Sequence, residues 1–524
     1  MLLILAGLLI WCLTLWRAIQ MFGPGRDLNN VSFNSDSAIN VLMANDDRPI
    51  TIFNFYYYGA DRWGAWAFLV AQLIRRLTGY HWTPESLTVL QIVWVLVGAF
   101  ALAGLDRRDR WLAGALYLAV VCLHTESRYM LFELSQLYAW QNTATLLSWW
   151  CLRRLFDSFL EPADRAVGRR LAWVLLAFGA TYLAIWSSVA SAVFLFFLLG
   201  VEVLRAWLKG PEGWGVRRVL SPAALGLGAL LGAALLERFQ KVVYRDYSVR
   251  TYGNPYTTTF HFDWAYLRHN FGELWHSLVT LSWWPMYTVP AIGLLAFAGA
   301  FVYAVIKRNE DLRTRLTTAI ASDTAMLAIG TFVMAVVNFA LTVVVDHVRF
   351  NDYDTRYLTL TNVFAPISGV LTIFLLVMFV VRQPRAQTVV RAVFVAAVLV
   401  LLVIRFPAPR EAADYKQLKK TALTLARKAP NGILMGKYWD TYVFTALQPQ
   451  QPMTPVPFEG DEFRTPWTPA ALQRTRDVVV AYPILARQLY SPPATLRQYG
   501  RTMTLIDPRW YEDQAYVFAL YALM

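Results

Sequence analysis

Apolar runs long enough to cross a bilayer recur along this chain of 524 residues, from Leu2 to Ile404. A helix needs roughly 20 predominantly apolar residues to span the hydrocarbon core of a membrane. Only 16% of the residues are charged, whereas a typical soluble domain has about 25%. The sequence therefore predicts an α-helical polytopic membrane protein. It excludes a soluble enzyme with an ordinary surface, and it excludes a disordered chain.

We expect eleven transmembrane helices. The run at 1–20 lacks the basic start and the small-x-small cleavage site of a signal peptide, so we expect a retained anchor. Cys12, Cys122 and Cys151 lie inside or at the end of apolar runs, which favours neither a disulfide framework nor a thiolate metal site. The predicted helices lie at about 1–20, 84–105, 111–124, 136–152, 171–186, 188–205, 219–236, 284–306, 322–344, 358–381 and 387–405.

Basic residues gather in five of the connections between the predicted helices. Because the chain crosses the membrane back and forth, these five connections lie on the same side. The positive-inside rule makes this side cytoplasmic, so the N-terminus is cytoplasmic and an odd number of helices puts the C-terminus outside. We expect the bacterial inner membrane as the location. Most of the basic residues behind the net charge of +13 then lie in cytoplasmic loops, where they set the orientation of the helices. The basic clusters are Arg107, Arg108 and Arg110; Arg153, Arg154, Arg165, Arg169 and Arg170; Lys209, Arg217 and Arg218; Lys307, Arg308, Arg313 and Arg315; and Arg382, Arg385 and Arg391.

This topology divides the chain into a transmembrane module, residues 1–405, and a small extracytoplasmic α/β domain, residues 406–524. The module has two long outer loops, at about 21–83 and 237–283. In the tail, AADYKQLKKTALTLARKA predicts an amphipathic helix, and NGILMGKY, DVVVAY, RTMTLI and AYVFALYAL predict strands. Four prolines separate the first helix-strand unit from the rest. They are Pro449, Pro452, Pro455 and Pro457.

Ionisable residues are almost absent from the middle of the predicted helices. The nearest exceptions, Glu202 and Asp323, lie close to helix boundaries. A proton- or ion-coupled carrier keeps such groups near the midplane, because they carry the coupled charge. The pattern therefore argues against a secondary transporter.

The first outer loop carries a carboxylate that is a candidate functional residue, Asp36. It stands at the start of an amphipathic segment, Ala38 to Ala44, which we expect to lie along the membrane surface. Asp61, Arg62 and Tyr58 follow as substrate-binding candidates, because carboxylates and aromatic rings together bind sugars. A helix cap at Asp36 and an aromatic belt at the interface are structural alternatives for the same residues.

Metal binding is only weakly indicated. Asp46 and Asp47 are compatible with a divalent cation, but two carboxylates alone do not establish a site. His261, His269 and His276 are spaced too loosely for a zinc site. No other cofactor is expected.

Basic residues alternate with aromatic ones in the second outer loop, where Lys241 and Arg245 are candidates for phosphate binding. The pattern also suits nucleic acid, but the outer side of a membrane does not routinely offer that partner, so lipid phosphate is the better target. The short loop HTESRYMLFELSQLY contains Arg128, Glu126 and Glu133 as further candidate functional residues.

The order of these features resembles the GT-C fold of polyprenyl-phosphate-sugar-dependent glycosyltransferases. The shared features are an aspartate early in a long outer loop after the first span, an odd number of spans and an outer C-terminal domain. The superfamily includes protein O-mannosyltransferases and the aminoarabinose transferase of lipid A. Its early aspartate often stands in an Asp-Glu or Asp-Asp pair, whereas this chain has Asp36 followed by Ser37.

A second matching element is DTRYLTLTN, just before the tenth span. Many GT-C enzymes have an Arg-Tyr pair at this point, and the resemblance implies that Arg356 and Tyr357 bind the donor phosphate. A guanidinium suits this task, because it offers forked donors to phosphate oxygens and keeps its charge near lipid. The resemblance also implies an acidic residue in the short loop, which Glu126 or Glu133 would supply, and some members use a divalent cation.

The resemblance implies transfer of a sugar from a polyprenyl phosphate to a glycan, lipid or protein acceptor on the outer face. Direct attack on the anomeric carbon would invert its configuration. It needs a base, which we assign to Asp36, and positive charge at the leaving phosphate, which we assign to Arg356 with Arg245, Lys241 or Arg128 as helpers.

Two other functions remain open from the sequence. An O-antigen polymerase or ligase also joins lipid-linked glycans outside the membrane, and a lipid or glycan flippase would use the outer domain as a binding module. A scaffold role for the tail is a third reading. In the tail, GKYWDTYVF offers side chains fit to bind a sugar or to fill a core. They are Tyr438, Trp439, Asp440 and Tyr442.

Overall fold

The computed structural model describes most of the chain, and all structural statements below refer to this part. The described residues are 12, 16, 33, 35–58, 63–106, 108–124, 130–132, 134, 136–160, 167–209, 217–252, 259–280, 285–381, 383–405, 413–448, 453–461, 468–473, 477–483, 492–513 and 515–523.

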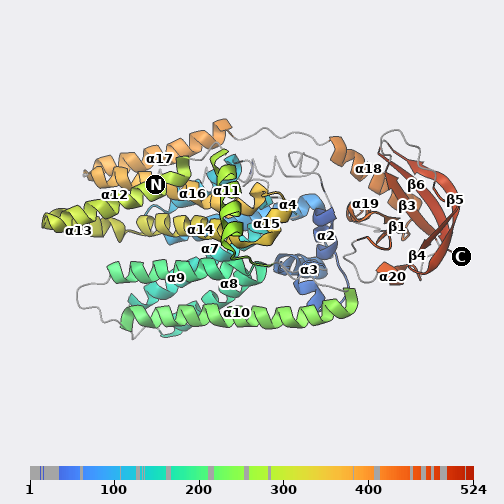
Figure 1. Cartoon of the computed structure of the whole chain (residues 1–524), viewed down its shortest axis with the longest axis horizontal. Helices are drawn as coiled ribbons and strands as arrows, with labels where there is room; N and C mark the ends of the chain where they lie inside the picture. The colour runs from blue at the N-terminus through green and yellow to red at the C-terminus, as the bar shows by residue number, and fades with distance from the viewer. Residues whose placement is uncertain are drawn as a thin grey trace.

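A bundle of long helices forms the larger part of the molecule (Figure 1). Within the described part, seven helices are long and apolar enough to cross a membrane. α5 (Arg110–Leu123), α7 (Tyr138–Leu160) and α17 (Pro384–Arg405) run in the same bundle. The chain is therefore a multi-pass membrane protein. The seven long helices are α4 (Pro84–Leu105), α8 (Val167–Ser187), α9 (Ala190–Lys209), α10 (Arg217–Tyr252), α12 (Pro285–Ile306), α14 (Asp323–Val344) and α16 (Thr359–Val380).

Shorter helices connect or cap the long ones. They are α2 (Ser35–Ala44), η1 (Ile52–Phe55), α3 (Trp66–Thr78), α11 (Trp264–Thr280), α13 (Glu310–Ile320), α15 (Asp346–Phe350) and η3 (Thr355–Leu358).

Each predicted apolar run from residue 84 onward is a helix in the structure, whereas the run at 1–20 lies outside the described residues except for Cys12 and Trp16. Side-chain caps mark the starts of α4, α13 and α14. The Thr83 hydroxyl accepts a hydrogen bond from the Ser86 amide (3.2 Å) at the start of α4, and such caps satisfy amides that have no partner inside the helix. Two helix ends lie well beyond the prediction, because α7 ends at Leu160 and not at 152, and α10 ends at Tyr252 and not at 236. α10 continues to Tyr252 because neither glycine nor proline interrupts residues 233–252.

The tail folds into the predicted small α/β domain, which completes the predicted fold class. One sheet has the strand order β2-β1-β3-β6-β5-β4. β1 pairs in parallel with β2 and β3, and the other neighbours are antiparallel. The strands are β1 (Ile433–Gly436), β2 (Thr454–Pro457), β3 (Asp477–Pro483), β4 (Thr495–Gln498), β5 (Arg501–Glu512) and β6 (Tyr516–Leu523). The helices are α18 (Ala413–Lys428), α19 (Tyr438–Ala446) and α20 (Thr468–Ala471).

The strand β2 was not expected, because the proline-rich segment indicated only a break. It is an edge strand, paired with β1 alone. The Thr454 amide donates to the carbonyl of Gly432, just before β1, at 3.0 Å, and the Phe458 amide donates to the Gly436 carbonyl of β1 at 2.8 Å. Pro455 and Pro457 alternate with the donating residues, so their missing N–H groups fall on the unpaired side. Proline is tolerated in a sheet at such edges.

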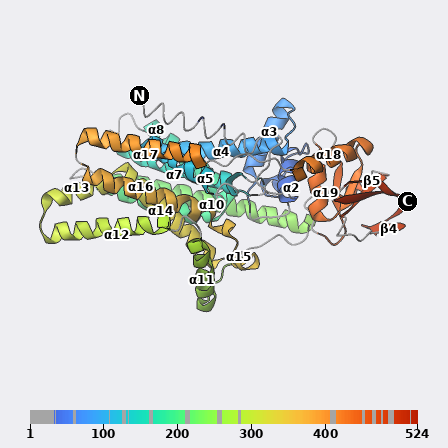
Figure 2. The same ribbon diagram turned by 90° about the horizontal axis from the view of Figure 1, so that it is seen from above.

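The α/β domain sits at one end of the helix bundle, next to α2 (Figures 1 and 2). α19 packs against α2. At a second point, the Tyr415 hydroxyl and the Lys419 ammonium of α18 both donate to Glu85 Oε1 of α4, at 2.9 and 2.8 Å. The segment Ala38–Ala44 is therefore almost wholly buried between the bundle and the domain. We expected this segment to lie along the membrane surface, and the structure shows that α19 packs against it.

A buried network of charges joins α7, α9 and α14. Glu202 is 0% exposed, and its carboxylate accepts from Arg153 (2.8 Å), from Arg205 (2.7 Å) and from the Trp149 indole (2.8 Å). Arg205 also pairs with Asp157 at 2.8 Å. We had assigned Arg153 to topology alone, because a sequence does not show which basic residues of a loop turn back into the bundle.

Removing one partner from a buried ion pair costs about 3–5 kcal/mol, because the other charge stays buried and unpaired. We therefore expect Glu202→Leu to lower the thermal unfolding midpoint of the detergent-solubilised protein. Glu310→Gln is the matched control, because it removes an exposed pair with Arg313, and such pairs contribute little. Identical unfolding midpoints for both variants and the wild type would contradict the role of the network.

Candidate functional site

The Asp36 carboxylate lies where the helix bundle meets the α/β domain. Its Oδ1 atom accepts two hydrogen bonds, from the Tyr57 hydroxyl at 3.0 Å and from the Tyr438 hydroxyl at 2.9 Å. The second donor is 402 residues away in the chain, on the first turn of α19. Within the described part of the chain, no side chain is bound to Oδ2. One oxygen is thus fixed by two tyrosine hydroxyls.

The loop that carries Tyr57 is held by backbone pairing. The Tyr57 amide donates to the Trp63 carbonyl at 3.0 Å, and the Ala65 amide donates to the Phe55 carbonyl at 2.9 Å. Gly64 is required by close packing, because a Cβ atom there would lie 2.0 Å from the Trp186 carbonyl oxygen. The sequence therefore fixes the Tyr57 hydroxyl over the first turn of α2.

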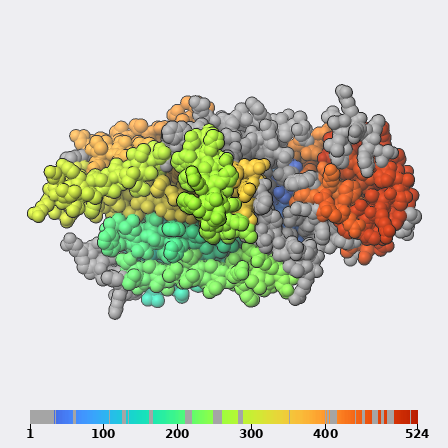
Figure 3. All heavy atoms as spheres, in the orientation of Figure 1, coloured from blue at the N-terminus to red at the C-terminus, as the bar shows by residue number. Residues whose placement is uncertain are grey.

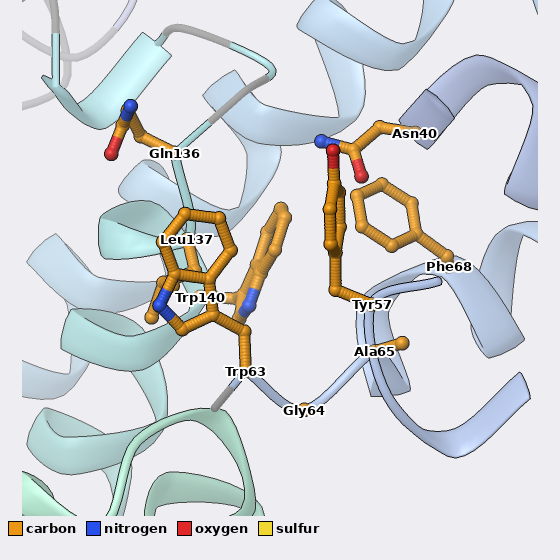
Figure 4. Close-up of a pocket in the computed structure, with 9 residues that line it drawn as sticks. All are labelled: Asn40, Tyr57, Trp63, Gly64, Ala65, Phe68, Gln136, Leu137 and Trp140. Carbon is orange, nitrogen blue, oxygen red and sulfur yellow. The ribbon is translucent and has the colours of Figure 1, made fainter. Parts of the chain in front are cut away.

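A small pocket opens beside Asp36, and Figure 4 shows the side chains around it. Tyr57 lines the pocket and also donates to Asp36. Asn40, one helical turn beyond Asp36 on α2, lies at the same end as the Tyr57 hydroxyl. Trp63 and Trp140 supply indole rings. The pocket has a volume of about 10 Å³, which is room for about one water molecule and not for a sugar ring.

Asp46 and Asp47 are held by different arginines. Arg48 makes a two-pronged contact with Asp46, at 2.8 and 2.6 Å, and the Tyr58 hydroxyl also donates to Asp46. Burial would raise the pKa of Asp46, but the hydrogen bond and charge of Arg48 outweigh it and hold the pKa below its usual value. The hydrogen bond from Arg75 likewise lowers the pKa of Asp47.

These pairings bear on two predicted roles. Tyr58 is fully buried and is bonded to Asp46 in this structure. Burial raises the pKa of its phenol and the charge of Asp46 adds to that rise, so Tyr58 acts as a neutral donor. Asp46 and Asp47 do not converge on one point, and the described residues contain no group of three or more histidine, cysteine, aspartate or glutamate side chains fit to hold a metal ion.

Arg356 lies on η3, in a turn between α14 and α16. Its guanidinium donates to the Tyr357 hydroxyl at 3.2 Å and to the Asn351 side chain, and it lies over the Tyr357 ring at 5.0 Å. The side chain is 29% exposed. The predicted Arg-Tyr pair is therefore in direct contact. The Tyr138 hydroxyl, at the start of α7, interacts electrostatically with Arg356.

The turn before Arg356 is strained. Asp352 and Tyr353 have φ angles of 49° and 54°, a left-handed conformation that costs non-glycine residues about 1–3 kcal/mol each. The Tyr353 amide donates to the Val348 carbonyl at 3.0 Å, and its hydroxyl donates to Asn270 of α11 at 2.9 Å. The surrounding contacts therefore hold this turn in a single conformation.

Lys241 and Arg245 lie one turn apart near the end of α10 and are partly exposed. They stand on a helix rather than on the predicted open loop. The neighbouring Glu237 accepts a hydrogen bond from the Tyr56 hydroxyl at 3.2 Å, which ties α10 to the segment that precedes Tyr57. The sequence analysis did not single out Glu237. Five predicted site residues lie outside the described part of the chain: Asp61, Arg62, Glu126, Arg128 and Glu133.

An apolar groove of about 650 Å³ opens on the side of the bundle. α9 contributes Val193 and Phe197, and the second half of α14 contributes most of the other wall. Phe260 and Phe262, just before α11, close one end. The groove ends near Val344, and the Phe260–Val345 bridge lies beside it.

Comparisons with known proteins return only structural similarity. No protein-family profile and no curated protein matches the chain. Among solved structures, it is similar to the archaeal oligosaccharyltransferase AglB from Archaeoglobus fulgidus in complex with an inhibitory peptide and a dolichol-phosphate. The identity is 10% and the TM-score is 0.44, over 90% of this chain and 69% of that chain.

Two further structures are similar. ArnT from Cupriavidus metallidurans has 13% identity and a TM-score of 0.41, over 99% of this chain and 97% of that chain. Arabinosyltransferase EmbB from Mycobacterium smegmatis has 12% identity and a TM-score of 0.28, over 93% of this chain and 44% of that chain. AglB and EmbB are glycosyltransferases by name. With identities and TM-scores this low, the matches assign neither a substrate nor a residue role to this chain.

Proposed function

We propose that this protein is a membrane glycosyltransferase that moves a sugar from a polyprenyl-phosphate donor to a glycan, lipid or protein acceptor. The reaction takes place on the outer face of the bacterial inner membrane, with the N-terminus cytoplasmic and the α/β domain outside. The observation that carries the proposal is Asp36. Its Oδ1 is fixed by two tyrosine hydroxyls, and its Oδ2 is left without a partner among the described residues.

In the proposed reaction, an acceptor hydroxyl attacks the anomeric carbon from the face opposite the phosphate. The new C–O bond forms as the bond to the phosphate oxygen breaks, and the configuration inverts. Asp36 Oδ2 takes the hydroxyl proton, and the electron pair of the broken bond leaves with the polyprenyl phosphate. A carboxylate is a weak base towards a hydroxyl, so the proton moves in the transition state rather than before it.

Arg356 is proposed to stabilise the leaving phosphate. Its guanidinium is partly exposed, and Tyr357 and Asn351 fix its orientation. Preorganised positive charge at the point where negative charge develops is often the largest single contribution to catalysis. Lys241, Arg245 and Arg128 remain proposed helpers. A divalent cation is not needed for this scheme.

The apolar groove between α9 and α14 supports a lipid-linked donor. Its lining side chains are aliphatic or aromatic, so burial of an isoprenoid chain there is favoured by the hydrophobic effect. The groove lies beside Val345, a few residues before the Arg356 turn. A lipid chain in the groove would place its phosphate near that turn.

The direct test uses purified protein in nanodiscs with a panel of polyprenyl-phosphate sugars and crude envelope glycans as acceptors. Release of free polyprenyl phosphate, measured by mass spectrometry, is expected for at least one donor. Release should depend on both Asp36 and Arg356. Transbilayer movement of the intact donor without cleavage would instead indicate a flippase.

Tyr438 should matter for rate because it orients Asp36. Hydrogen bonds to charged groups contribute about 1.5–3 kcal/mol, so we expect Tyr438→Phe to lower kcat by about tenfold or more with little change in KM.

Tyr415→Phe is the matched control for this prediction. It removes a hydroxyl from the same interface between the α/β domain and the bundle, but that hydroxyl bonds Glu85 and not Asp36. The control should keep the wild-type kcat. Equal effects of the two variants would show that Tyr438 only supports domain docking.

A further inference from the structure

α11 differs from the long helices in its direction. It runs across the axis of the bundle in both Figures 1 and 2, and Figure 2 shows it standing out from the side of the bundle. In the space-filling view it forms a ridge on the surface (Figure 3). It lies in the chain between α10 and α12, two helices that are long and apolar enough to cross a membrane. A helix at right angles to membrane-spanning helices lies parallel to the bilayer plane.

Three faces of α11 can be told apart. One face docks on the protein through Asn270, Leu274 and Leu278, which are buried and spaced by four residues. A second face is polar and exposed. It carries His269, Glu273 and His276.

The third face is an exposed aromatic stripe, which we define as Trp264, Phe271 and Trp275. These side chains are 76%, 50% and 48% exposed. Their spacing of seven and four residues places them on one side of the helix. Phe271 and Trp275 stack with ring centroids 6.1 Å apart. Exposing a row of large aromatic rings to water is unfavourable, and exposed apolar patches of this kind mark sites of contact with protein or membrane.

We propose that α11 lies in the outer interface of the bilayer with its aromatic stripe inserted among the lipids. The stripe is continuous with apolar surface that already faces lipid, because Phe260 and Phe262, just before α11, line the groove on the side of the bundle. Aromatic residues on one face and polar residues on another are typical of helices in this position. Arg268, on the same side as the stripe, is exposed and can extend to the headgroups.

This placement also sets the depth of the Arg356 turn. The docked face of α11 packs against Val343, Val348 and Leu358, and Tyr357 borders the same cluster. The Asn270 amide donates to the Val343 carbonyl at 2.9 Å and its side-chain oxygen accepts from Tyr353 at 2.9 Å. Because α11 lies at the depth of the lipid headgroups, the Arg356 turn that packs against it lies at the depth of the lipid phosphates. This second step rests on the proposed function, whereas the membrane contact of α11 does not.

Site-directed spin labelling tests the proposal without any assay of activity. Single nitroxide labels are placed at 264, 271 and 275 on the stripe and at 269, 273 and 276 on the polar face, in a full-length chain whose native cysteines are replaced. The protein is reconstituted in nanodiscs of phosphatidylethanolamine and phosphatidylglycerol. Collisions with oxygen, which concentrates in lipid, are compared with collisions with a water-soluble nickel chelate.

The stripe labels are expected to collide several-fold more with oxygen, relative to nickel, than the polar-face labels on the same helix. A label at Asp352, beside the Arg356 turn, should give a ratio between these two groups. A label at Arg509, exposed on β5, serves as the water reference. Stripe labels as open to nickel as Arg509 would overturn the proposal. Stripe labels shielded from both reagents would also overturn it, because they would indicate a second copy or another protein over this face.

A stripe in lipid with a water-like ratio at 352 would keep the anchor and reject the coupling to the Arg356 turn. The proposed glycosyl transfer would stand or fall separately, on the release of polyprenyl phosphate.

Discussion

Asp36→Asn is expected to lower the rate of sugar transfer by about 10²–10⁴, the usual range for a lost general base. Asparagine keeps the size of the side chain and still accepts hydrogen bonds from Tyr57 and Tyr438, but it cannot take the acceptor proton. The protein should therefore fold and bind donor as the wild type does. Turnover of a polyprenyl-phosphate sugar, followed together with the thermal unfolding midpoint, measures both quantities.

Asp47→Asn is the control for this variant. Asp47 lies in the same outer loop, but its carboxylate is exposed and pairs with Arg75, so its loss should leave the rate almost unchanged. A wild-type rate for Asp36→Asn would remove Asp36 from the mechanism. An equal loss for both variants would point to a general need for acidic residues in the loop, as a bound cation would impose.

Arg356→Ala should be the second large effect. Removal of one preorganised donor to developing negative charge costs about 10²–10³ in kcat, and Arg356 is also placed to bind the donor phosphate in the ground state, so KM for the donor should rise as well. Arg356→Lys keeps the charge but loses the planar fork, so it should restore only part of the rate. Steady-state kinetics with the donor varied separates the two contributions.

Arg349→Ala controls for nonspecific charge effects near this turn. Arg349 is an exposed arginine on α15, seven residues before Arg356. If its loss matched that of Arg356→Ala, long-range attraction of an anionic donor would explain the result. If Arg356→Ala turned over at the wild-type rate, the leaving phosphate would have to be stabilised elsewhere.

Much of the fold follows from patterns that act within a few residues. Apolar runs and capping residues such as Thr83 mark the long helices, because both signals are local. Alternation and turn residues likewise indicate four strands of the tail, β1, β3, β5 and β6, whereas β2 and β4 were not predicted. β2 was not predicted because proline usually interrupts a strand. Its prolines are tolerated because β2 lies at the edge of the sheet.

The contacts of the candidate site could not be predicted from local sequence patterns, because they join segments that are far apart in the chain. Asp36 and the Arg356–Tyr357 pair stand out by their place in the topology. The partner of Asp36 does not, since Tyr438 meets it only because α19 docks on α2. Tyr438 was noticed as an aromatic residue fit for sugar binding, without its contact. Glu202 shows the same limit, because its burial depends on which arginines of the loops turn inward.

The central claim is that Asp36 and Arg356 act on one glycosyl phosphate. An electron cryomicroscopy structure of the Asp36→Asn protein with a bound polyprenyl-phosphate sugar tests it most directly. The account predicts density for the phosphate within hydrogen-bond distance of the Arg356 guanidinium, the lipid chain in the groove between α9 and α14, and the anomeric carbon facing residue 36. A phosphate bound away from Arg356, with residue 36 outside the same cavity, would contradict it.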